Sequence, residues 1–402
     1  MKKIKDLLRW LMLLYKNALY QAAKILERTE EKTVIFEAFQ GRSVSCNPKA
    51  LYEEMKTNEK YKDYQFIWSL RNTNRLDLKG ENTSVVKFES FQYYRALAKA
   101  KYWIFNSNTR PFLKPRKEQI FVQTWHGTPL KKIGCDVEKT GNAMTKFSEI
   151  SRIYTKESKK ISYMISPSEY CTKKFISAFR MKEVNKEDRV LTTGYPRNDY
   201  LFKATKTECQ EIKKQLQIPQ DKKVILYAPT FRDNKYSAAA GFEVANFIDF
   251  CKAEQSLKED YVILFRAHYF ISQKLDVSQY KGFVYDVSKV EDINTLYVIS
   301  DILVTDYSSV FFDYANLKRP IIFYMTDYEE YKNNLRDFYF DVEQLPGPVV
   351  REQEELVKYI KKFSQEFEPD EKYCNFNKKY NYLDGASTSK KVLDMIIENK
   401  YN

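Results

Sequence analysis

Short apolar runs alternate with segments that have the hydrophobic spacing of amphipathic helices along most of this chain. The run 262–265 (Val-Ile-Leu-Phe) is apolar at every position, which is typical of a parallel strand covered on both faces. The predicted strands form two series: 33–39, 64–70, 84–88, 102–107, 120–125, 163–168 and 189–194, then 223–229, 261–268, 283–288, 301–306 and 320–325. Strands that alternate with helices predict parallel sheets with helices on both faces.

The polar stretch 201–222 separates the two series of strands and predicts a helix and a linker near a domain boundary. We therefore expect an α/β protein with two doubly wound Rossmann-type domains, 31–205 and 206–402, that face each other across a cleft. In such sheets, ligands bind beyond the carboxyl ends of the strands. Candidate chemistry should therefore lie directly after each predicted strand.

Residues 1–30 predict an amphipathic helix that precedes the first domain. Apolar residues such as Leu7 and Leu11 fall on one face of a helical wheel, and lysines fall on the other. The longest unbroken apolar run, 10–15, is far short of the roughly 20 residues that span a bilayer. A basic amphipathic helix is typical of a segment that lies on an anionic membrane surface. The alternative is docking on its own domain or on a partner chain. Because the first strand begins near residue 33, we expect the core not to depend on this helix.

Composition narrows the choice of partner. The chain has 402 residues and a net charge of +13, which fits a nucleic acid, an anionic membrane or a phosphate-rich substrate. No arginine-rich block or RNA-binding motif is present, so we expect no nucleic-acid partner. The six cysteines are scattered without a Cys-x-x-Cys pair, which argues against a disulfide framework or a zinc site. There is no glycine-rich phosphate loop, so side chains and helix N-termini would have to hold any phosphate.

The chain has only two histidines, and both lie at the ends of predicted strands. His126 follows the strand 120–125 and precedes a Gly-Thr-Pro turn, whereas His268 closes the strand 261–268. A single histidine is often a satisfied core or surface group. Two histidines at strand ends, each beside a turn or an arginine, indicate instead that both imidazoles lie at the rim of the cleft.

Hydroxyl and charged side chains follow the strands in the same way. Ser308 and Ser309 precede a helical segment and are good N-cap residues, and a helix N-terminus also attracts anions. Asp313 lies in that segment, where it is alternatively a surface carboxylate, and Arg232 could instead pair with the adjacent aspartate. The remaining candidates at strand ends are Arg266, Gly127, Thr128 and Lys131.

Five stretches of the chain resemble the CDP-glycerol glycerophosphotransferase family, the teichoic acid primases and polymerases. They are Gln123-Thr-Trp-His-Gly-Thr-Pro-Leu-Lys131, Gly194-Tyr-Pro-Arg-Asn-Asp199, Ala228-Pro-Thr-Phe-Arg-Asp233, Arg266-Ala-His268 and Ser300-Asp-Ile-Leu-Val-Thr-Asp-Tyr-Ser-Ser-Val-Phe-Phe-Asp-Tyr-Ala315. Two further stretches, Pro320-Ile-Ile-Phe-Tyr324 and Pro346-Gly-Pro348, continue the pattern, and the resemblance runs in family order over about residues 33–350. The resemblance implies a GT-B-like fold and peripheral attachment to the cytoplasmic face of a Gram-positive bacterial membrane.

The resemblance also implies a reaction, in which CDP-glycerol gives glycerol phosphate to a hydroxyl of a lipid-linked saccharide acceptor and releases CMP. The domain 31–205 would then hold the acceptor and 206–402 the CDP-linked donor. An attacking alcohol needs a base, and a histidine suits this task near neutral pH, so we assign that role to His126. Gly127 and Thr128 would let the acceptor approach, and Lys131 would steer it.

On the donor side, Arg232 and His268 would neutralise the pyrophosphate and help CMP to leave. Ser308 and Ser309 would bind phosphate oxygens, and Asp313 would bind donor hydroxyls. Arg266 would contact the donor or only support the site. We expect no cofactor, and a divalent metal is not implied.

Three alternatives remain open from the sequence. The donor could be CDP-ribitol, or the product a capsular polymer, because nothing in the motifs distinguishes the polyol. A nucleotide-sugar glycosyltransferase could share the same two-domain fold. A membrane-bound protein that binds anionic polymers without catalysis would show the same basic charge. Neither the number of units added nor the oligomeric state is predicted.

Overall fold

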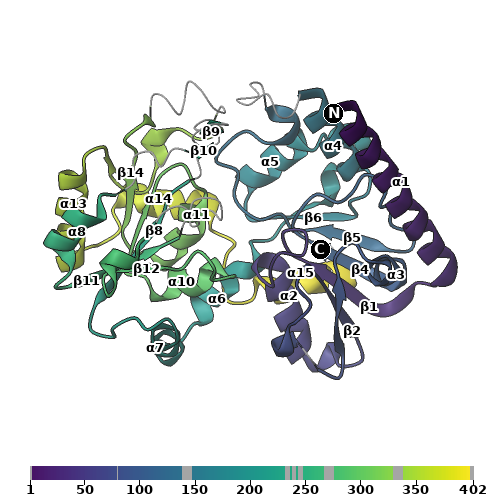
Figure 1. Cartoon of the computed structure of the whole chain (residues 1–402), viewed down its shortest axis with the longest axis horizontal. Coiled ribbons are helices and arrows are strands. Elements are labelled where there is room, and N and C mark those ends of the chain that lie inside the picture. The colour runs from purple at the N-terminus through teal and green to yellow at the C-terminus, as the bar shows by residue number, and fades with distance from the viewer. Residues whose placement is uncertain are drawn as a thin grey trace.

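A computed structural model of the chain describes residues 2–78, 80–137, 147–230, 236–237, 241–242, 248–266, 276–328 and 338–398. Two of the predicted site residues, Arg232 and His268, lie outside the described residues. Two parallel sheets lie side by side, each flanked by helices (Figure 1). The predicted architecture of two doubly wound α/β units is therefore confirmed.

The first sheet has seven strands in the order β3-β2-β1-β4-β5-β6-β7, and each strand lies where the apolar pattern predicts one. The strands are β1 (Glu30–Glu37), β2 (Gln65–Leu70), β3 (Thr83–Lys87), β4 (Ala100–Phe105), β5 (Ile120–Gln123), β6 (Tyr163–Ser166) and β7 (Val190–Thr192). The flanking helices are α2 (Cys46–Thr57), α3 (Phe91–Lys99), α4 (Phe147–Ser158) and α5 (Glu169–Ala178). The chain changes direction across the sheet between β1 and β4, which places a ligand-binding crevice at the carboxyl ends of the central strands.

The second sheet has six parallel strands in the order β12-β11-β8-β13-β14-β15. The strands are β8 (Lys223–Ala228), β11 (Tyr261–Phe265), β12 (Val284–Asp286), β13 (Ile302–Thr305), β14 (Ile321–Tyr324) and β15 (Val349–Val350). The helices are α7 (Lys206–Gln215), α8 (Phe250–Leu257), α10 (Ile293–Ile299), α11 (Val310–Tyr314), α13 (Gln353–Gln365) and α14 (Glu371–Tyr380). The edge strand β15 was not predicted, because two residues are too few to show a periodic pattern.

Consecutive residues of β8 show why these strands are apolar throughout. Val224 and Leu226 pack into the core on one face of the second sheet. Ile225 and Tyr227 pack into a separate core on the other face. Helices cover both faces, so neither set of alternate positions reaches water.

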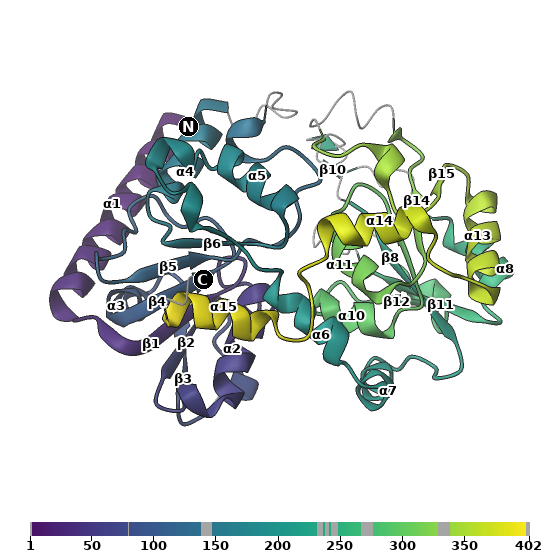
Figure 2. The same cartoon turned by 180° about the vertical axis from the view of Figure 1, so that it is seen from behind.

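The last helix, α15 (Thr388–Ile397), returns to the first sheet. Val392 and Ile396 are completely buried in the core around β1 and β2. Figure 2 shows α15 beside α2, on the side of the first unit. The carboxylate of Asp199 accepts hydrogen bonds from the backbone N–H groups of Thr388 and Ser389, both at 2.9 Å, and so holds the start of this helix. The second unit predicted at 206–402 thus does not keep its final helix, because that helix finds its apolar partner on the first sheet.

Helix α1 (Lys2–Leu26) forms as predicted but uses its two sides differently. Tyr20 and Ala23 are completely buried in the core beside α3, and the Tyr20 hydroxyl donates to the carbonyl of Lys114 at 2.6 Å. The core therefore does depend on the second half of α1, contrary to expectation. The predicted apolar face points away from the core, and Leu7 and Leu11 are 54% and 47% exposed. In the described part of the chain, no helix is both long and apolar enough to cross a bilayer.

Candidate active site

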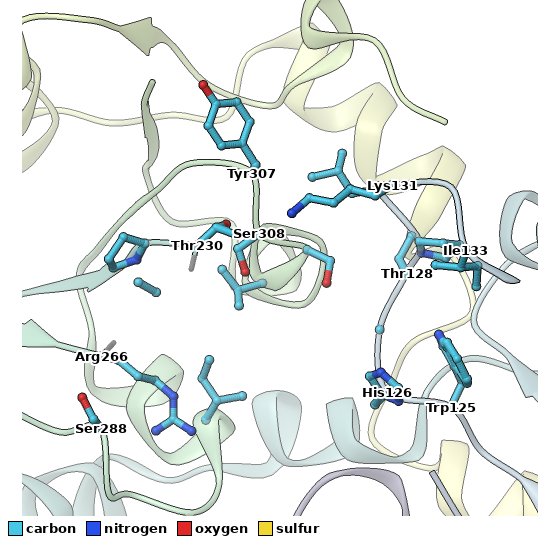
Figure 3. Close-up of a pocket in the computed structure, with 18 residues that line it drawn as sticks. Trp125, His126, Thr128, Lys131, Ile133, Thr230, Arg266, Ser288, Tyr307 and Ser308 are labelled. Atoms are coloured by element: carbon cyan, nitrogen blue, oxygen red, sulfur yellow. The ribbon is translucent and has the colours of Figure 1, made fainter. Parts of the chain in front are cut away.

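A cavity of about 590 Å³ lies between the carboxyl ends of the two sheets. Figure 3 shows Trp125, His126 and Lys131 on one side of it and Thr230, Arg266 and Ser308 on the other. Seven of the predicted site residues line the cavity: His126, Gly127, Thr128, Lys131, Arg266, Ser308 and Ser309. Among the described residues that line it there is no carboxylate, so the cavity suits an anionic ligand.

The strand β5 ends just before a sharp turn that directs His126 into the cavity. Trp125 has a φ of 51°, in the left-handed region that a bulky residue occupies only under strain. The Nδ1 atom of His126 lies 2.6 Å from the carbonyl oxygen of Asn106. A carbonyl oxygen only accepts hydrogen bonds, so Nδ1 carries the proton and Nε2 keeps its lone pair. The Trp125 ring stacks on the imidazole with 4.4 Å between the centroids, which fixes its plane.

The surroundings of His126 keep the imidazole neutral. His126 is solvent-exposed on the side of the cavity, and its ring contacts the rings of Trp125 and Phe39, which displace water from it. This desolvation lowers the pKa of His126 to about 4, and the charge of Arg197 adds to the effect, against the opposing hydrogen bond to Asn106. At neutral pH the side chain can therefore accept a proton at Nε2 without first losing one.

Asn47, at the start of α2, holds the strained turn in place. Its side chain is completely buried and donates to the carbonyl oxygens of Thr124 at 3.0 Å and Trp125 at 3.2 Å. Its own oxygen accepts from the backbone N–H of Arg197 at 3.1 Å. Sequence reasoning missed Asn47, because it lies about 80 positions before the turn and only the fold brings the two together.

The Gly-Tyr-Pro-Arg-Asn-Asp motif after β7 joins the two units behind the cavity. The hydroxyl of Tyr195 donates to the carbonyl of Gly127 at 3.0 Å. Arg197 makes an ion pair with Asp313 of α11, with N–O distances of 2.7 and 3.0 Å. Asn198 donates to the same carboxylate at 3.1 Å. Asp313 therefore differs from its predicted role: it is buried, does not line the cavity, and uses its oxygens to tie the second unit to the first.

The loop after β13 forms the opposite wall of the cavity. Asp306 accepts hydrogen bonds from the backbone N–H groups of Thr230 at 2.8 Å and Tyr307 at 2.6 Å, which fixes the loop shape. Ser309 occupies the N-cap position of α11, but its side chain makes no capping hydrogen bond. A Cβ atom added to Gly127 would lie 3.0 Å from the Ser309 hydroxyl, so glycine permits the close approach of the two walls.

Arg266 lies at the end of β11 and is held within its own unit. Its guanidinium donates to the carbonyl oxygens of Val287 at 3.3 Å and Val290 at 2.6 Å. Burial lowers the pKa of Arg266 from its ordinary value. Among the described residues, no group of three or more histidine, cysteine or acidic side chains could hold a metal ion. The expectation that no metal is required stays a prediction.

Two parallel sheets with a cavity between their carboxyl edges define a GT-B-like protein, and the cavity pairs a neutral imidazole on one unit with hydroxyls and an arginine on the other. Residues 19–398 match the family model described as CDP-glycerol:poly(glycerophosphate) glycerophosphotransferase. The chain belongs to this family of transferases, as the motifs predicted.

Curated relatives agree with this assignment. The chain is 38% identical to the teichoic acid poly(glycerol phosphate) polymerase of Bacillus spizizenii over 399 residues, which cover 98% of this chain and 100% of that protein. It is also 38% identical to the teichoic acid glycerol-phosphate transferase of Staphylococcus aureus, with 96% of this chain and 98% of that protein covered. The corresponding Bacillus subtilis polymerase is longer, and the match spans 51% of it. Identity to the poly(ribitol-phosphate) polymerase of B. spizizenii is lower, at 32%.

Among solved structures, the wall teichoic acid polymerase TagF is 36% identical to this chain with a TM-score of 0.86, and the match covers 100% of this chain and 98% of the TagF chain. A histidine-to-asparagine variant of TagF soaked with CDPG has the same TM-score of 0.86. The GT-B-like fold predicted from the sequence is therefore confirmed. The roles assigned to individual site residues stay predictions.

Proposed function

We propose that this chain transfers glycerol phosphate from CDP-glycerol to a hydroxyl of a lipid-linked saccharide and releases CMP, in the synthesis of teichoic acid or a related polymer. The observation that carries this proposal is the imidazole of His126, with its free Nε2, in a cavity whose described lining includes Lys131 and Arg266 and no carboxylate. Glycerol as the polyol is supported by the higher identity to the glycerol-phosphate enzymes than to the ribitol-phosphate enzyme.

His126 acts as the general base in this proposal. The acceptor oxygen attacks the phosphorus atom that bears the glycerol, and its proton passes to Nε2 of His126. The bond from that phosphorus to the bridging oxygen breaks, and CMP leaves with the bonding electrons. The hydrogen bond from Nδ1 to the Asn106 carbonyl supports the imidazolium that forms, because a carbonyl oxygen favours the protonated ring.

The second unit holds the donor phosphates in this proposal. Ser308 and Ser309 provide hydroxyls opposite Gly127, and Arg266 provides positive charge beside them. Lys131 reaches towards Ser308 from the first unit (Figure 3). Stabilisation of the developing charge is the main contribution that a protein makes to phosphoryl transfer. The predicted roles of Arg232 and His268 in neutralising the pyrophosphate belong to the same proposal.

Helix α1 lies in the membrane interface in this proposal, with the enzyme attached peripherally at the cytoplasmic face. The exposed apolar side chains of Leu7, Leu11 and Ile25 support it, because they point away from the core that buries Tyr20. An exposed apolar stripe on a basic helix suits the boundary between headgroups and acyl chains. Such attachment would bring the cavity close to a lipid-linked acceptor.

The test supplies CDP-glycerol, CDP-ribitol and a UDP-sugar separately, each with a lipid-linked disaccharide analogue, and measures release of the nucleotide. We expect CMP from CDP-glycerol at the highest rate, and product mass shows whether one unit or many are added. Preferential turnover of CDP-ribitol would assign ribitol instead of glycerol as the transferred polyol. Release of UDP would assign the chain to the nucleotide-sugar glycosyltransferases instead. Salt-sensitive binding of anionic polymers without CMP release would contradict catalysis altogether.

A further inference from the structure

A second and larger cavity, of about 990 Å³, lies at the other end of the first sheet and is strongly basic. Its walls come from the segments before β5, β6 and β7 and from one side of α1. The cations that line it are Lys114, Arg116, Lys117, Lys156, Lys159, Lys160 and Lys186. These segments lie at the amino ends of the strands, whereas His126 follows the carboxyl end of β5. This basic cavity is therefore separate from the candidate active site.

The fold fixes several of these cations in position. Lys160 is held by the buried carboxylate of Glu157 at 2.9 Å. The ammonium of Lys186 donates to the carbonyl oxygens of Lys159 at 2.9 Å and Ile161 at 2.6 Å. Arg116 donates to the carbonyl of Glu27 at 2.7 Å, which ties the cavity wall to the segment after α1.

The positive charge in the basic cavity is only partly compensated. Among the described residues that line it there is no carboxylate, and the Nε atom of Arg116 is buried there without a hydrogen-bond partner. Burial lowers the pKa of Lys160, and the nearby charges of Lys114 and Lys156 lower it further, against the opposing effect of Glu157. An anion in the cavity would relieve this repulsion between like charges.

Helix α1 indicates which anion fits. Asn17 and Gln21, one turn apart, line the basic cavity. They lie on the flank of the helix between the buried Tyr20 and the exposed apolar face that includes Leu14, which is 45% exposed. A basic cavity thus adjoins an exposed apolar surface, and this combination matches a phospholipid with an anionic headgroup.

We propose that the basic cavity binds the phosphate of an anionic phospholipid headgroup while α1 contacts the acyl region beside it. This inference rests on the proposed interfacial position of α1. The inference goes beyond an interfacial α1 in two ways. It makes attachment to the membrane depend on particular lysines that lie outside α1, and it gives the enzyme a preference for anionic phospholipids.

The test uses the full chain and two charge-matched variants. The cavity variant, Lys156→Gln with Lys159→Gln, removes two exposed cations of the basic cavity. The α13 variant, Lys358→Gln with Lys361→Gln, removes two exposed cations within α13. Figures 1 and 2 show α13 and α1 at opposite ends of the molecule. Binding is measured by sedimentation with vesicles of phosphatidylcholine alone and with vesicles that also contain phosphatidylglycerol.

We expect the cavity variant to bind phosphatidylglycerol vesicles roughly 10- to 30-fold more weakly than the parent, the scale for two basic groups near an anionic surface. The α13 variant should stay within about twofold, and neither variant should change on neutral vesicles or in CMP release with a water-soluble acceptor. Equal losses in both variants would overturn the cavity proposal and leave the position of α1 intact. Failure of the parent to bind either vesicle would overturn both. Release of the parent from vesicles by soluble inorganic polyphosphate, with lysine-dependent binding of that polyanion, would assign the cavity to a soluble ligand instead.

Discussion

The substitution Asn47→Ala tests whether the turn that presents His126 depends on one buried amide. Asn47 makes three hydrogen bonds: two to the carbonyl oxygens of Thr124 and Trp125, and one from the N–H of Arg197. Loss of the first two costs about 0.5–1.5 kcal/mol each, and a buried N–H left without a partner costs about 1–3 kcal/mol. We therefore expect the free energy of unfolding to fall by about 2–6 kcal/mol.

Activity should fall as well, because the same amide fixes the backbone of the strained residue Trp125. A shift of about 1 Å in the position of His126 is enough to reduce transfer by roughly 100-fold. We expect kcat for CMP release to fall by at least about tenfold. The KM for CDP-glycerol should change little, because the donor groups lie on the other unit.

Urea unfolding followed by tryptophan fluorescence measures the stability change, and steady-state CMP release measures the catalytic one. Asn82→Ala is the control, because its amide makes one solvent-exposed hydrogen bond to the Lys62 carbonyl in the same unit. That variant should lose less than about 1 kcal/mol and keep full activity. The reasoning is refuted if Asn47→Ala unfolds within about 0.5 kcal/mol of the parent and retains its kcat.

His126→Ala should keep CDP-glycerol binding but lose transfer by at least about 100-fold; transfer within threefold of the parent would remove it as the base. In the parent, the acidic limb of kcat/KM should lie below the ordinary range of histidine, since desolvation by the surrounding protein lowers the pKa of His126 to about 4. Asp384 lies between α14 and α15 and accepts hydrogen bonds from the backbone N–H of Tyr195 at 2.8 Å and from the side-chain amide of Asn198 at 2.7 Å. Burial nevertheless raises the pKa of Asp384 to about 7, so protonation of this carboxylate favours the folded state. Its contribution to stability is complete below about pH 4 and is lost as the pH rises to about 7. The thermal midpoint of Asp384→Asn should therefore vary less over this range than that of the parent, and an unchanged slope would contradict the assignment. Leu7→Ser with Leu11→Ser should weaken sedimentation with neutral vesicles without changing CMP release from a soluble acceptor, whereas undiminished binding would place the membrane surface elsewhere.

The alternation of apolar runs and helical segments was sufficient to predict the fold. Every strand of the first sheet and five of the six in the second lie where a run of apolar residues predicts one. This succeeds because a strand buried on both faces must be apolar at each position, and that requirement is visible in the sequence without knowledge of its neighbours. The strand β15 was not predicted, because it consists only of Val349 and Val350.

The position of His126 could also be predicted, since strand ends in doubly wound sheets face the ligand. The role of Asp313 could not, because its partner Arg197 lies 116 positions earlier in the chain. A carboxylate that binds donor hydroxyls and a carboxylate that ties two domains together look the same in the sequence. Only the distances between side chains in the folded protein distinguish the two roles.

Helix α1 likewise has one property that the sequence determined and one that only the tertiary structure decided. Its amphipathic pattern was determined by the sequence, and the helix forms as predicted. The sequence could not say which face meets the core, because a helix with an apolar stripe normally buries that stripe. The tertiary structure buries Tyr20 and Ala23 against α3 and leaves Leu7 and Leu11 outside. Local pattern fixes the elements because it acts through the backbone and its nearest neighbours, while the use of each face depends on contacts that exist only after the chain has folded.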